Sequence, residues 1–164
     1  MTSTIVVLGI GNLERGDDGA GRVTARLLRH MLAGRAEVYE LDGEATAILA
    51  KIEDASAVFM IDASRLQAPP GTVHRIDAAQ GPLPQSRSDL SSHGFGVAAA
   101  IELGRTLARL PSAVIVYAIE GECFEVGAPL SPAVSTATTI VADRIRCEIE
   151  EMDASSPPCT RRRR

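Results

Sequence analysis

The stretch T-I-V-V-L-G-I-G at residues 4–11 decides the fold class of this 164-residue chain. A largely apolar run that is closed by glycines is typical of a strand buried on both faces of a parallel sheet. Such a strand needs helices on both sides of its sheet to cover it. The opening of the sequence therefore predicts an α/β fold.

Strand and helix patterns alternate along the rest of the chain. Further strands are predicted at residues 37–41, 57–61, 72–76 and 113–119. Helices are predicted at residues 18–32 and 44–52, between His93 and Pro111, and from Ser131-Pro132 onward. We therefore expect a single three-layer α/β/α domain with a five-stranded, mainly parallel twisted sheet. The expected domain covers residues 1–152, and residues 153–164 are expected to form a disordered, Arg-rich tail.

The helix predicted at residues 18–32 has an apolar side and a basic side. Val23, Leu27, Leu28 and Met31 recur at helical spacing, so we expect them to share the buried face. The arginines between them are expected to face solvent.

Composition excludes several classes of function. The formal net charge is −4, which disfavours a general nucleic-acid binder. No apolar run is long enough to span a membrane, and the first residues do not resemble a signal peptide. The three cysteines are widely spaced and form no zinc pattern. We expect a cytoplasmic protein.

Polar residues gather where the predicted strands end. Asp17 and Asp18 follow the first strand, Asp62 follows the third, His93 precedes a helix, and Glu120-Gly121-Glu122 follows the last strand. Ligands of α/β sheets bind at the carboxyl ends of the strands. A functional site that contains several carboxylates and an imidazole is therefore expected at this edge of the sheet.

Two kinds of site fit this edge poorly. Gly9-Ile10-Gly11 resembles the start of a dinucleotide-binding motif, but Glu14 replaces its third glycine. Asp17 and Asp18 would also repel a pyrophosphate, so no nucleotide cofactor is expected. A serine hydrolase is disfavoured because the G-x-S-x-G pattern does not occur, and Cys123 alone is a weak candidate nucleophile.

A site that recognises a metal ion fits this edge better. Two carboxylates and one imidazole suit a divalent ion such as nickel or zinc, and three protein ligands leave positions open for a substrate. Each residue also has a structural alternative. Asp18 also suits the cap of a helix, Asp62 an Asx-turn and His93 a loop hydrogen bond.

Taken together, the motifs resemble the [NiFe]-hydrogenase maturation endopeptidase family. The resemblance covers roughly residues 4–150. It is carried by V-V-L-G-I-G-N at 6–12, G-D-D-G-A-G at 16–21, M-I-D-A at 60–63, P-G-T at 70–72, S-H-G-F-G at 92–96 and L-S-P-A-V at 130–134.

The resemblance implies a function and a set of site residues. It implies an aspartic-type or metal-dependent peptidase that removes the C-terminal extension of a hydrogenase large-subunit precursor after nickel insertion. Asp18, Asp62 and His93 would be its catalytic and metal-contacting residues, and the nickel would be supplied by the substrate. The family also implies a monomer that acts on this protein partner, with no nucleic acid or membrane involved.

Three points stay open at the level of sequence. The first acidic residue of the family site is often Glu, and an aspartate side chain is one methylene shorter. Whether Asp17 or Asp18 reaches the metal therefore stays open. The general base is Asp17, Asp18 or Asp62, unless the metal activates the water. The alternative functions are a non-catalytic module that binds the precursor or handles nickel, and a metal-dependent hydrolase of small molecules.

Overall fold

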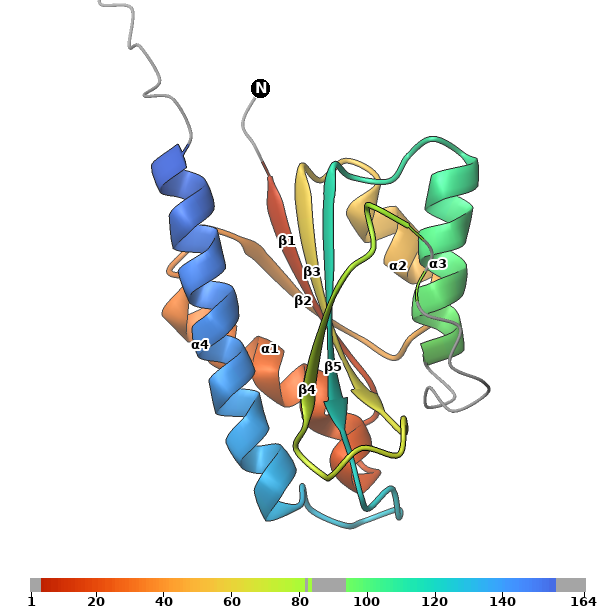
Figure 1. Ribbon diagram of the computed structural model, residues 1–164, viewed down its shortest axis with the longest axis vertical. Helices are drawn as coiled ribbons and strands as arrows, with labels where there is room; N and C mark the ends of the chain where they lie inside the picture. The colour runs from red at the N-terminus through yellow and green to blue at the C-terminus, as the bar shows by residue number, and fades with distance from the viewer. Residues whose placement is uncertain (1–3, 82, 84–93, 156–164) are drawn as a thin grey trace, which may run out of the picture.

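The computed structural model describes residues 4–81, 83 and 94–155 and contains one five-stranded sheet (Figure 1). The strands are β1 (Ile5–Ile10), β2 (Glu37–Leu41), β3 (Ala57–Ser64), β4 (Val73–Asp77) and β5 (Ala113–Glu120). The helices are η1 (Gly16–Gly19), a single 3₁₀ turn, and α1 (Ala20–Met31), α2 (Ala45–Ile52), α3 (Gly94–Thr106) and α4 (Pro132–Ser155).

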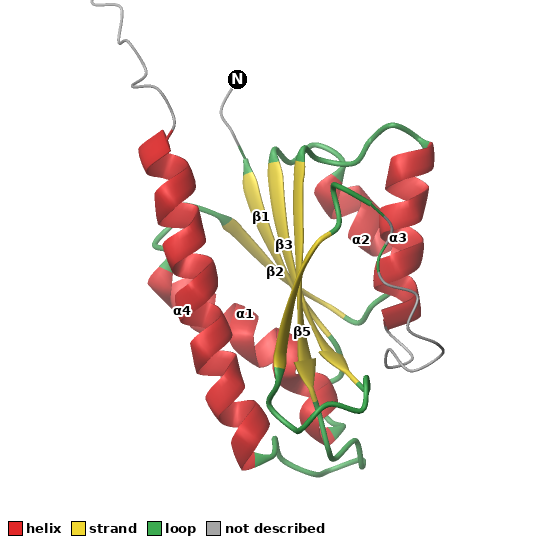
Figure 2. Ribbon diagram, in the orientation of Figure 1, coloured by secondary structure: helices red, strands yellow, loops and turns green. Residues whose placement is uncertain are grey.

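The strand order is β2-β1-β3-β5-β4. Strands β2, β1, β3 and β5 are parallel, and β4 pairs antiparallel with β5 at the edge. Helices α1 and α4 cover one face of the sheet, and α2 and α3 cover the other (Figures 1 and 2). The three-layer α/β/α fold with a mainly parallel sheet is therefore confirmed.

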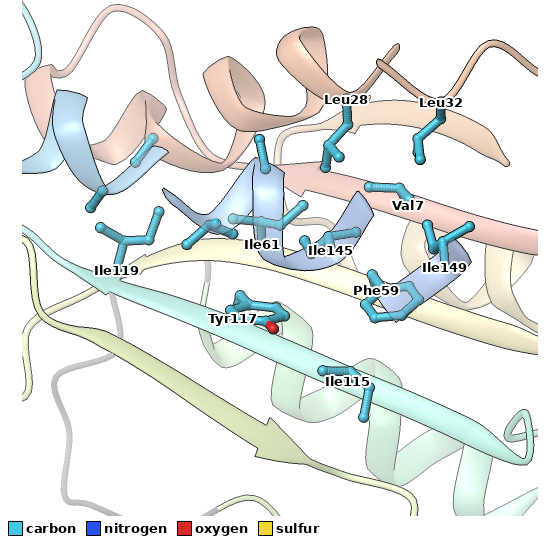
Figure 3. Close-up of a cluster of buried hydrophobic side chains, with 14 of the residues drawn as sticks. Val7, Leu28, Leu32, Phe59, Ile61, Ile115, Tyr117, Ile119, Ile145 and Ile149 are labelled. Atoms are coloured by element: carbon cyan, nitrogen blue, oxygen red, sulfur yellow. The ribbon is translucent and has the colours of Figure 1, made fainter. Parts of the chain in front are cut away.

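Two apolar clusters fill the spaces between these layers. The cluster beneath α1 and α4 includes Val7, Phe59, Ile61, Tyr117 and Ile145, all with at most 1% of their surface exposed (Figure 3). The other cluster lies beneath α2 and α3. All residues of β1 and β3 are buried, as expected for central strands covered on both faces. This packing fixes the ends of β1 and β3, where the candidate site lies.

The prediction for the first helix was wrong in its start and only partly right in its buried face, where Leu28 is fully buried as expected. Helix α1 begins at Ala20, and Asp18 lies in the preceding turn η1. Leu27 and Met31 are each 37% exposed. Besides Leu28, the buried face contains small residues, because the helix backbone lies against β1. A Cβ on Gly9 would come within 2.4 Å of the Gly21 carbonyl oxygen.

Among the other boundaries that differ from the predictions are the ends of β3 and α4. Strand β3 continues past Asp62 to Ser64, since its pairing with β5 extends to Glu120. Helix α4 extends to Ser155, three residues into the expected tail. The rest of that tail lies outside the described residues. None of the helices in the described part of the chain combines the length and apolarity needed to cross a membrane.

Candidate functional site

Asp18 lies at the carboxyl edge of the sheet, in the turn between β1 and α1. The residue is 2% exposed, and its Oδ2 accepts a hydrogen bond from the Asn12 backbone N–H at 3.2 Å. Gly11 makes this turn possible, because its φ is +132° and a Cβ there would lie 1.8 Å from the Asp18 carbonyl oxygen. The N-cap of α1 is Gly19. Asp18 therefore does not have the capping position that its sequence allowed.

Asp62 lies inside β3, two residues before the strand ends, and is 3% exposed. Its Oδ1 accepts the Ala63 backbone N–H at 2.8 Å. Its Oδ2 is buried and has no hydrogen-bond partner among the described residues. A buried carboxylate oxygen without a donor is costly, and proteins retain such groups mainly for a function.

The two carboxylates interact electrostatically. Burial raises the pKa of Asp62 well above its usual value, the Ala63 N–H opposes this rise, and the negative charge of Asp18 adds to it. Asp18 and Asp62 come from different elements, so the fold brings together two of the three residues predicted for the site.

Asp17, by contrast, is held by hydrogen bonds from the backbone. It is fully buried, and its carboxylate accepts three backbone N–H groups, from Glu122 at 2.9 Å, Cys123 at 3.0 Å and Ser131 at 2.7 Å. Three N–H donors satisfy the acceptor oxygens of this buried side chain. Both oxygens are thus occupied, and Asp17 is poorly placed to bind a metal or to activate water.

His93, the third residue predicted for the site, lies outside the described residues. Within residues 4–81, 83 and 94–155, no three His, Cys, Asp or Glu side chains are grouped so as to hold a metal ion. The contribution of His93 therefore stays a prediction, and the described part of the site consists of Asp18 and Asp62.

Glu120 is a further buried carboxylate at this edge, and no separate role was predicted for it. It is 3% exposed, and its Oε2 accepts the Ser64 hydroxyl at 3.0 Å and the Leu66 backbone N–H at 2.9 Å. Glu120 thereby fixes the chain just after β3. Its position at the end of an apolar strand was visible in the sequence, but its partners depend on the strand order.

The acidic pair suits a divalent cation chemically. Two carboxylates that repel each other gain from a positive charge between them, and the Asp62 Oδ2 has no hydrogen-bond partner among the described residues. Two carboxylates alone do not complete the coordination shell of such an ion. A metal held here would need further ligands.

The fold and this edge define an α/β/α protein with a buried acidic pair at the carboxyl ends of its parallel strands. The family model described as hydrogenase maturation protease matches residues 23–147. The chain belongs to the hydrogenase maturation protease family.

Comparisons with individual proteins agree with this assignment. The chain is 29% identical over 139 residues to the hydrogenase expression/formation protein HupD of Thiocapsa roseopersicina. The match covers 82% of this chain but only 62% of that relative, so this chain spans less than two thirds of the relative's length.

Solved structures share the fold. The hydrogenase maturating endopeptidase HybD from E. coli superimposes with a TM-score of 0.78 at 21% identity, over 91% of this chain and 93% of that one. The [NiFe] hydrogenase maturation protease HybD from Thermococcus kodakarensis gives a TM-score of 0.71 at 19% identity, over 89% and 99%.

Proposed function

We propose that this protein is an endopeptidase that removes the C-terminal extension of a [NiFe]-hydrogenase large-subunit precursor after nickel insertion. One observation carries the proposal. In a member of the hydrogenase maturation protease family, Asp62 keeps a buried oxygen without a hydrogen-bond donor among the described residues, next to the charge of Asp18.

The proposed role of this pair is to recognise nickel that the substrate already carries. Asp18 and Asp62, together with His93, would supply part of the coordination shell, and the precursor would supply the rest. An incomplete shell on the protein suits a checkpoint, because it binds well only when the substrate brings the ion and its remaining ligands. A precursor without nickel would meet two carboxylates with no cation between them.

Peptide hydrolysis also needs proton transfer. The attacking water loses a proton to a base, its oxygen bonds to the carbonyl carbon, and the leaving amine gains a proton as the C–N bond breaks. We assign proton transfer to the Asp18–Asp62 pair, because the Asp17 carboxylate is taken up by three backbone N–H groups. A nickel ion in the substrate would lower the pKa of a bound water or polarise the scissile carbonyl.

The test is cleavage of the cognate nickel-loaded precursor, followed by intact-mass spectrometry. The wild-type protein is expected to shorten the precursor by one C-terminal peptide. Asp62→Asn and His93→Ala are expected to leave the mass unchanged.

Asp77→Asn is the matched control for Asp62→Asn. Asp77 is exposed at the end of the antiparallel strand β4. It pairs with Ile115 near the start of β5, so it lies at the amino ends of the parallel strands, away from the acidic pair at their carboxyl ends. This variant is expected to cleave normally. Full cleavage by both Asp62→Asn and His93→Ala would remove the role proposed for the site.

A further inference from the structure

The loop between β5 and α4 has an unusual composition for a surface segment. Residues 121–131 read G-E-C-F-E-V-G-A-P-L-S, and most of the side chains are apolar or small. Val126 is 78% exposed, the highest value among the large hydrophobic side chains that the structure describes. Phe124 and Leu130 are only half-buried. Leu130 packs against the core cluster beneath α1 and α4, and Arg65 lies over the Phe124 ring, so Val126 is the large apolar side chain that folding leaves in water in this loop.

The loop is firmly bonded to the segment that carries Asp18. Three backbone hydrogen bonds join them: Gly16 N–H to the Ala128 oxygen at 3.1 Å, Asp17 N–H to the Cys123 oxygen at 2.8 Å, and Gly127 N–H to the Glu14 oxygen at 2.7 Å. The Asp17 carboxylate adds three more bonds to backbone N–H groups of the loop.

The same loop is also joined to the strand that carries Asp62. The Gly121 N–H donates to the Ser64 carbonyl oxygen at 3.0 Å. The Arg65 guanidinium lies 3.8 Å from the centre of the Phe124 ring, in a cation–π contact. The loop therefore connects the two segments that carry the acidic pair, and its position relative to Asp18 and Asp62 is fixed.

From this arrangement we propose that residues 121–131 form the surface on which an apolar stretch of the substrate polypeptide docks, with Val126 as a contact residue. The inference rests on the proposed function and names where that substrate binds. A loop held by this many backbone bonds loses little conformational freedom on binding, which favours its use as a recognition surface.

The charge of the loop limits the kind of partner. Glu122 and Glu125 are exposed on either side of Phe124. Two carboxylates at this position disfavour nucleic acid and anionic lipid, which both carry negative charge. An apolar stretch of polypeptide fits the exposed Val126 without placing like charges together.

The test compares three variants in cleavage of the nickel-loaded precursor. Val126→Asn makes the contact polar without changing charge, and Val126→Ile preserves its apolar character. Leu107→Asn is the matched control. Leu107 is 50% exposed and lies just after the end of α3. The chain continues from there to the start of β5, at the amino ends of the parallel strands. Circular dichroism verifies that all three fold.

If the loop is a docking surface, Val126→Asn raises KM by about tenfold and leaves kcat unchanged. This is expected when the bound substrate and the transition state lose the same binding free energy. Val126→Ile and Leu107→Asn are expected to keep the wild-type KM. If wild type cleaves and Val126→Asn has an unaltered KM, the docking surface is wrong and the proposed peptidase stands.

Direct binding separates the two proposals further. The dissociation constant of the precursor is measured for wild type and Val126→Asn under conditions without turnover. A weakening of about tenfold in Val126→Asn supports the docking surface even where wild type fails to cleave, a result that would overturn the peptidase proposal. Equal dissociation constants overturn the docking surface.

Discussion

Asp17 and Asp18 are adjacent in sequence, yet their carboxylates have different environments. Asp17 accepts three backbone N–H groups from the loop between β5 and α4. Asp18 accepts the Asn12 N–H and acts on Asp62, whose pKa its charge helps to raise. One acidic residue therefore holds the structure together, and its neighbour belongs to the candidate site.

This difference predicts opposite effects on stability and activity. Asp17→Asn replaces a charged acceptor by an amide with one acceptor oxygen, and leaves at least one buried N–H without a partner. We expect it to lower the free energy of unfolding by about 2–4 kcal/mol. Urea denaturation measures this value. Asp18→Asn is the matched comparison and is expected to cost much less, so a similar loss in both variants would contradict the structural role of Asp17.

Asp62→Asn is expected to keep or raise stability while it abolishes cleavage. The wild-type carboxylate is buried, and its Oδ2 has no donor among the described residues, so a neutral amide of the same shape removes a desolvation cost. The free energy of unfolding, measured in urea at neutral pH, tests the first part. A clear loss of stability would show that the Asp62 charge contributes to folding.

Close packing between α1 and the sheet yields a third prediction. A Cβ on Gly21 would lie 2.2 Å from the Ile61 carbonyl oxygen and 2.4 Å from that of Ile10. Gly21→Ala is therefore expected to destabilise the protein by about 3 kcal/mol or more. The control is Gly104→Ala in α3, where the nearest atoms are side-chain carbons at 3.4 Å.

In that control, alanine is expected to stabilise the helix by about 0.5–1 kcal/mol. Thermal unfolding ranks wild type and the two variants. A Gly21→Ala protein as stable as Gly104→Ala would show that α1 does not lie so close to β1.

A polar cluster between β5 and α4 predicts a pH effect on stability. The Tyr117 hydroxyl donates to Glu148, which also accepts two hydrogen bonds from Arg75, at 2.9 and 2.7 Å. Burial, followed by the hydrogen bond to Glu148, raises the pKa of Tyr117 from 10.0 to about 12.

The folded state therefore holds the Tyr117 proton more tightly than the unfolded state. The stabilisation is fully present below pH 10 and is lost as the pH rises to about 12. Tyr117→Phe lacks this proton, so its stability relative to wild type is expected to improve over that range. Denaturation midpoints at pH 9 and pH 11 measure the difference, and a constant difference would contradict the cluster.

The sequence predicted the fold well, because buried parallel strands leave apolar runs such as residues 57–61 that are visible without a structure. It predicted the buried face of α1 only in part. Helical spacing of bulky apolar residues indicates Leu28, but Gly21 and Ala25 face the sheet because their small size allows close approach.

The sequence predicted that Asp18 and Asp62 lie in one site, because the carboxyl ends of parallel strands meet at one edge of the sheet. It did not separate Asp17 from Asp18, because the distinction depends on backbone N–H groups of Glu122, Cys123 and Ser131, far along the chain. No local pattern records such contacts.

The most direct test of the account is the nickel dependence of cleavage. The wild-type protein is incubated with its cognate large-subunit precursor, prepared with and without inserted nickel, and the products are weighed by mass spectrometry. The account predicts loss of one C-terminal peptide from the nickel-loaded precursor alone. Equal cleavage of both forms would contradict nickel recognition by Asp18 and Asp62, and no cleavage of a verified nickel-loaded precursor would contradict the peptidase itself.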